Sequence, residues 1–66
     1  MATTIEKSYI APSGEEITWG RVDVTRQIEV ACWKNPGTDE EECRWSKLFD
    51  SEKHGDAVAE YERWKS

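Results

Sequence analysis

The polar turn at residues 35–38, Asn-Pro-Gly-Thr, lies between two short apolar segments and constrains the fold of this chain more than any other feature. Cys32 and Trp33 precede it, whereas Cys43 and Trp45 follow it and an acidic run. Turn residues between alternating apolar residues predict a β-hairpin. We therefore expect a central hairpin over about residues 26–49, which holds two of the four tryptophans of this chain.

Strand alternation assigns the two hairpin tryptophans to opposite faces of the sheet. If Cys32 faces Cys43, then Val30 faces Trp45 and all four lie on the apolar face. A register displaced by two residues keeps the same faces. The sequence therefore predicts Trp45 in the core and Trp33 on the other face, where it is either covered by a partner subunit or available to a target.

The N-terminal half predicts further strands. Residues 5–11 form the first candidate strand, which ends at the Pro-Ser-Gly turn of residues 12–14. Residues 15–25 form the second, but their apolar positions change parity on either side of Gly20. A β-bulge at this glycine would turn both sets inward, so we expect one there. Whether residues 17–34 form one strand or two stays open.

The apolar spacing changes after residue 49 from alternation to the helical period. The expected apolar stripe of this helix consists of His54, Ala57, Val58, Tyr61 and Trp64. Asp50 or Ser51 is the expected N-cap. The pattern predicts an α+β fold for a single compact domain over residues 1–66: a small antiparallel sheet of three to four strands with one C-terminal helix packed on one face.

The charge and hydropathy of the chain exclude several classes of function. Fourteen Asp and Glu against nine Lys and Arg give a formal net charge of −5, which opposes binding to a phosphate backbone. No apolar run is long enough to span a membrane, and residues 1–4 lack the basic and apolar regions of a signal peptide. We expect a cytoplasmic protein that binds neither nucleic acid nor membrane directly.

Cys32, Cys43 and His54 are the residues from which a zinc site could be built. Their spacing lacks the close ligand pairs of zinc motifs, so we expect no metal and no other cofactor, and a zinc-stabilised structural domain remains an alternative. Nothing supplies the orienting group that a Cys/His nucleophile needs, so we expect no enzyme. A Cys32–Cys43 disulfide requires the two residues to face each other, and a reducing compartment opposes it.

Aromatic residues outside the core are the expected contact residues, because Trp and Tyr dominate interface hot spots. The candidate partner-binding residues are Trp33, Arg44, Tyr61, Trp64, Asp39, Glu40, Glu41 and Glu42. They predict a non-catalytic protein-interaction module, a small inhibitor or adaptor, whose aromatic patch is framed by acids and whose partner has a basic surface.

Besides the zinc-stabilised domain, one alternative to this function stays open. An acidic nucleic-acid mimic, of the kind found among small phage-type inhibitors, would occupy the basic groove of a DNA- or RNA-handling protein. A homodimer is also compatible with so small a sheet, which leaves edges and one face uncovered.

Overall fold

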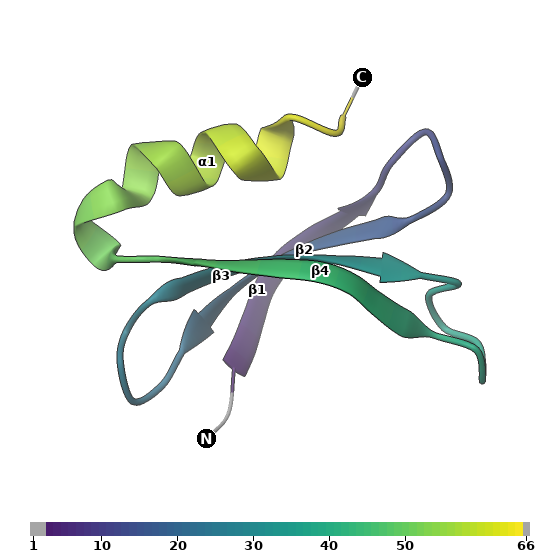
Figure 1. Ribbon diagram of the computed structural model, residues 1–66, viewed down its shortest axis with the longest axis horizontal. Coiled ribbons are helices and arrows are strands. Elements are labelled where there is room, and N and C mark those ends of the chain that lie inside the picture. The colour runs from purple at the N-terminus through teal and green to yellow at the C-terminus, as the bar shows by residue number, and fades with distance from the viewer. Residues whose placement is uncertain (1–2, 66) are drawn as a thin grey trace.

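The computed structural model describes residues 3–65 and consists of a four-stranded antiparallel sheet with one helix across one face (Figure 1). The predicted α+β fold with a packed C-terminal helix is confirmed. The strands follow chain order across the sheet and are β1 (Thr3–Ile10), β2 (Glu16–Val22), β3 (Ile28–Lys34) and β4 (Glu42–Phe49). A 3-10 turn (Ser51–Lys53) leads into α1 (His54–Glu62). Residues 1 and 2, part of the N-terminal start considered above, lie outside the described residues.

The central hairpin adopts the register displaced by two residues. Cys32 faces Trp45 rather than Cys43, and the register then shifts so that Trp33 faces Cys43. Arg44 is the extra residue of this bulge. The two cysteines consequently lie on opposite faces of the sheet, and both are free. The register in which the two cysteines face each other is therefore wrong, and they do not form the disulfide that this register would allow.

The bulge expected at Gly20 is also wrong. β2 pairs with β3 without any shift across this residue, and the irregularity lies on β1, where Glu6 has no partner in the register. Val22 therefore points away from the helix, and Val24 lies exposed in the turn after β2. Gly20 instead permits a close approach between strands, because a Cβ atom there would lie 2.9 Å from the carbonyl oxygen of Thr4.

A turn divides residues 17–34 into two strands. The N–H of Val22 donates to the carbonyl oxygen of Gln27 at 2.9 Å, which closes this turn. Arg26 within it has a positive φ of 60°, a backbone conformation outside that of a strand. Of the two alternatives left open by the alternation, the structure therefore has two strands.

α1 covers the sheet with the middle of the predicted stripe, whereas His54 is exposed and Trp64 lies beyond the end of α1. Ala57 and Tyr61 are buried and Val58 is half-buried. They pack on a core that includes Ile17, Trp19, Ile28, Val30 and Cys32. The predicted cap is wrong: neither the 3-10 turn nor α1 has a side-chain capping bond. Within residues 3–65, no helix has the length and apolar content needed to cross a membrane.

The strand register defines two faces, because directly opposed residues of antiparallel strands point to the same side. The helix side carries the core residues and Tyr9, Trp45 and Phe49. We call the other side the open face. Its principal side chains are Ile5, Ile10, Glu16, Thr18, Glu29, Ala31, Trp33 and Leu48.

Candidate functional site

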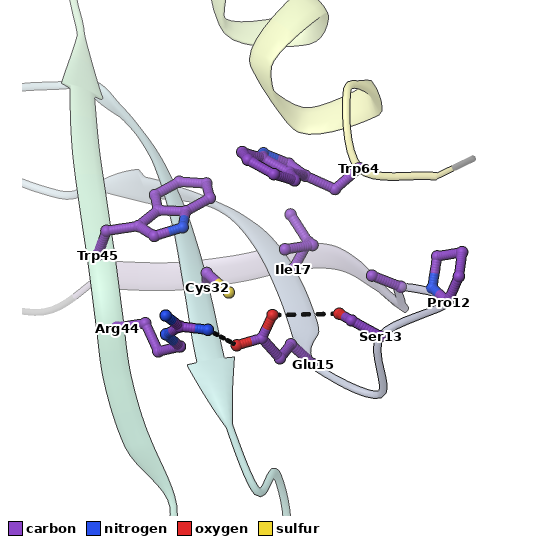
Figure 2. A pocket seen from close by; sticks show the side chains of 9 residues that line it. Pro12, Ser13, Glu15, Ile17, Cys32, Arg44, Trp45 and Trp64 are labelled. Carbon is purple, nitrogen blue, oxygen red and sulfur yellow. Dashed lines mark hydrogen bonds and ion pairs between the residues drawn. The ribbon is translucent and has the colours of Figure 1, made fainter.

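A pocket of about 360 Å³ lies on the helix side, where the β1–β2 turn, β4 and the segment after α1 meet (Figure 2). Its lining consists of Ala11, Pro12, Ser13, Glu15, Ile17, Cys32, Arg44, Trp45 and Trp64. Pockets that bind small organic groups occupy about 300–1,000 Å³ and combine apolar walls with a few polar groups. This pocket has both properties.

Trp45 and Trp64 form the aromatic wall of the pocket. Their ring centroids lie 5.8 Å apart, and the ring planes are tilted by 43°. Trp45 projects from the helix side of β4, whereas Trp64 follows the end of α1. The indole N–H of Trp64 donates to Glu60 at 3.3 Å, yet the residue is 38% exposed. Trp64 is therefore both held in place and accessible from solvent.

Arg44 and Glu15 form the polar rim of the pocket. Nη1 of Arg44 lies 2.6 Å from Oε2 of Glu15, and the hydroxyl of Ser13 donates to Oε1 of Glu15 at 3.1 Å. The hydrogen bond from Arg44 lowers the pKa of the Glu15 carboxyl, so this group is ionised at neutral pH. A guanidinium carries five N–H donors, so Arg44 can also donate to a ligand carbonyl.

Cys32 lies deep in this pocket, next to the ion pair (Figure 2). Its side chain is buried, and burial raises the pKa of the thiol, so it stays protonated at neutral pH. A protonated thiol is a poor nucleophile. His54 packs instead against Trp19, with ring centroids 5.4 Å apart. The pocket therefore offers apolar surface and hydrogen bonds rather than an activated nucleophile.

Arg44 and Trp64 are the two predicted contact residues that the structure brings together in the pocket. Trp33 lies on the open face, half-buried, and its indole N–H donates to Thr18 at 3.1 Å. Tyr61 is buried in the core with its ring edge-on to Tyr9. This burial corrects the expectation that Tyr61 is available to a partner: the helix needs its large ring to fill the space above the sheet.

The acidic run Asp39, Glu40, Glu41 and Glu42 is exposed between β3 and β4. Glu41 accepts a hydrogen bond from the backbone N–H of Gly37 at 3.0 Å, which ties the run to the turn. Figure 1 shows the β1–β2 and β3–β4 turns at the same end of the sheet. The acidic residues and the pocket therefore share this end.

The structure does not bring together the three residues considered for a zinc site. Cys32 lies on the helix side, Cys43 on the open face, and His54 at the start of α1. Across residues 3–65, no group of three or more His, Cys, Asp or Glu is arranged to hold a metal ion.

The sequence does not identify Glu15 and Trp45 as site residues, although both line the pocket. Alternation assigns Trp45 to the core, and its ring does pack there in part. Alternation cannot show that α1 ends before it covers this ring fully. The Glu15–Arg44 pair depends on the bulge at Arg44, for which the sequence carries no signal.

Comparison with protein-family models, with curated proteins and with solved structures finds no match for this chain.

Proposed function

We propose that this protein is a non-catalytic protein-interaction module that takes an apolar side chain of its partner into the pocket. The observation that supports this is the placement of two indole rings beside a solvent-accessible Arg44–Glu15 pair. Binding energy at protein interfaces concentrates in Trp, Tyr and Arg residues at well-packed pockets. The Trp45–Trp64 wall supplies the apolar contact, and the rim bonds the partner's backbone.

The charges around the pocket indicate the chemistry of the partner. Glu15 is ionised, the exposed acids at 39–42 share this end of the sheet, and the whole chain carries a net charge of −5. An anionic group would be repelled, whereas basic residues beside the inserted side chain would be attracted. The partner we propose therefore presents an apolar side chain flanked by Lys or Arg.

We also propose that the protein works in the cytoplasm. Cys32 and Cys43 lie on opposite faces of the sheet, so they do not form the cross-strand disulfide that an oxidising compartment would favour. Free thiols of this kind are suited to a reducing compartment.

A random peptide library displayed on phage and selected on the immobilised protein tests the pocket. The enriched peptides should share an apolar or aromatic residue next to Lys or Arg. Trp64→Ala should lower their affinity by about tenfold or more, because it removes half of the aromatic wall. Val24→Ala is the matched control, since Val24 is 69% exposed in the turn after β2, away from the pocket, and it should leave the affinity unchanged.

Three outcomes would overturn this proposal: no enrichment, a set of enriched peptides none of which Trp64→Ala binds more weakly, or an equal loss in both variants. Ionic strength separates the remaining alternative. An aromatic anchor predicts a weak dependence of affinity on salt. A steep loss with salt, together with full binding by Trp64→Ala, would instead support the acidic nucleic-acid mimic.

A further inference from the structure

The open face gathers exposed aliphatic side chains from both outer strands of the sheet. Ile5 and Ile10 of β1 are 49% and 60% exposed, and Leu48 of β4 is 55% exposed. Ile5 and Leu48 belong to one row of opposed residues across the sheet, and Ile10 belongs to a row with Trp33. Large apolar side chains gathered on one face mark an interaction surface.

Trp33 adds an aromatic anchor between the outer strands. It is half-buried, and its indole N–H is already bonded to Thr18 of β2 at 3.1 Å. Because that donor is satisfied within the protein, the exposed part of Trp33 presents apolar ring surface to a partner. A Trp held in place in this way loses little conformational freedom on binding.

Charged side chains of the strands are divided unequally between the two faces. The register assigns Glu16 and Glu29, both half-buried, to the open face. The basic residues Lys7, Arg21 and Lys47 face Trp19, Ile28 and Val30, respectively, on the helix side. Within the four described strands, the open face therefore carries two carboxylates and no basic side chain.

This division of charge decides what can cover the open face. A second copy would bring its own Glu16 and Glu29, so four carboxylates would enter one interface without a Lys or Arg from either open face. Burying unpaired carboxylates is costly. We therefore propose that the open face docks an amphipathic segment of another protein, which contacts Trp33 and Leu48 with apolar side chains and presents Lys or Arg to Glu16 and Glu29.

This docking surface lies on the opposite side of the sheet from the pocket and does not depend on it. The pocket residues Ile17, Cys32 and Trp45 and the open-face residues point to opposite sides of the same strands, so the sheet itself separates the two surfaces. Two partners can therefore be held at once. Such a geometry makes the chain an adaptor rather than a simple inhibitor.

A labelled Leu/Lys amphipathic peptide of about 14 residues, long enough to cross the four strands as a helix, tests the open face. Fluorescence anisotropy should show binding of this peptide and none of a matched peptide with Glu in place of every Lys. Measured in a Trp64→Ala background, which removes half of the pocket's aromatic wall, the double variant Ile10→Gln/Leu48→Gln should lower the affinity by about tenfold or more. Both side chains are exposed, so the variant should fold, as circular dichroism would check.

Matched charge variants separate docking from general attraction. Glu16→Gln/Glu29→Gln should weaken binding by about threefold or more, because rim charges contribute modestly. Glu52→Gln/Asp56→Asn changes the net charge equally at exposed positions at the start of the helical segment and should leave the affinity unchanged. An equal loss in both pairs would overturn the proposal, as would failure of the Lys peptide to bind.

Two further results distinguish this surface from the pocket and from self-association. Trp64→Ala should still bind the Leu/Lys peptide through the open face. A complete loss of binding in this variant would place the peptide in the pocket alone, which would overturn docking at the open face and leave the proposed function standing. Sedimentation equilibrium should find a monomer. A dimer that Leu48→Gln dissociates would show that a second copy covers the face and would overturn the proposal.

Discussion

The two faces of the sheet are built from the same four strands, yet α1 covers one, whereas the other leaves large apolar side chains of its outer strands in solvent. Ile28 on the helix side is 1% exposed, whereas Leu48 on the open face is 55% exposed. Two features separate these residues: α1 packs over the helix side only, and Leu48 lies on an outer strand whereas Ile28 lies on a central one. The exposed apolar side chains of the outer strands gain little from folding, so they can contribute to binding instead.

The largest expected difference between the faces concerns stability. Ile28→Ala should reduce the free energy of unfolding by about 2–5 kcal/mol, because it opens a cavity in the core. Leu48→Ala should change it by no more than about 0.5 kcal/mol, because that side chain is already in water. Urea denaturation followed by tryptophan fluorescence measures both. A loss at Leu48 as large as that at Ile28 would mean that the open face is covered.

Gly20 tests a place on the open face where β1 and β2 are in close contact. A Cβ atom at Gly20 would lie 2.8 Å from Cγ2 of Thr3 and 2.9 Å from the backbone oxygen of Thr4. We expect Gly20→Ala to cost about 1–3 kcal/mol by overpacking. Gly55→Ala is the control, because nothing lies within 4 Å of its Cβ position in α1, and alanine should add up to about 1 kcal/mol there. A higher melting temperature for Gly20→Ala than for Gly55→Ala would contradict this contact.

The two cysteines differ in exposure, so their reaction rates compare the covered helix side with the open face. Cys43 is exposed, whereas Cys32 is buried and burial raises the pKa of its thiol. Iodoacetamide at pH 8 should therefore alkylate Cys32 about tenfold or more slowly than Cys43, since the thiolate is the reactive form. Mass spectrometry of native and urea-unfolded protein measures the two rates. Equal rates in the native protein would show that the pocket exposes Cys32.

The smallest expected effect concerns the Arg44–Glu15 pair at the pocket rim. The pKa of Glu15 lies below its usual value of 4.5 because Arg44 donates a hydrogen bond to it. A lowered pKa in the folded state stabilises the protein above about pH 4.5, and this contribution is lost as the pH falls through the folded pKa. Arg44→Ala should therefore lower the Tm slightly at pH 7 and not at pH 2. The same difference at both pH values would contradict the pairing.

Much of the fold follows from spacing along the chain. Alternation predicts the hairpin and places Trp33 and Trp45 on opposite faces, as the structure has them. The change to helical spacing predicts α1, in which Ala57 and Tyr61 are buried. Spacing fails at Gly20. The bulge expected there rests on the assumption that every apolar strand residue points to one core, but Val22 points to the open face.

The candidate site follows from the sequence only in part. Arg44 and Trp64 can each be chosen as contact residues, but nothing in their spacing shows that they share a pocket. Lys47 illustrates the reason: it faces Val30 on the helix side, where its ammonium group pairs with Glu60 at 3.1 Å. A sequence pattern counts such a charge as a mismatch, since the compensating residue lies on another element.

The sequence by itself determined that strands and one helix form and which strand residues share a face, because propensity and side-chain direction depend on neighbours along the chain. Only the tertiary structure decided that Arg44 meets Glu15, that Trp64 meets Trp45 and that the open face carries carboxylates without basic partners. These features depend on the strand register, on one bulge and on where α1 ends. Such quantities are set by contacts between distant residues, which spacing does not encode.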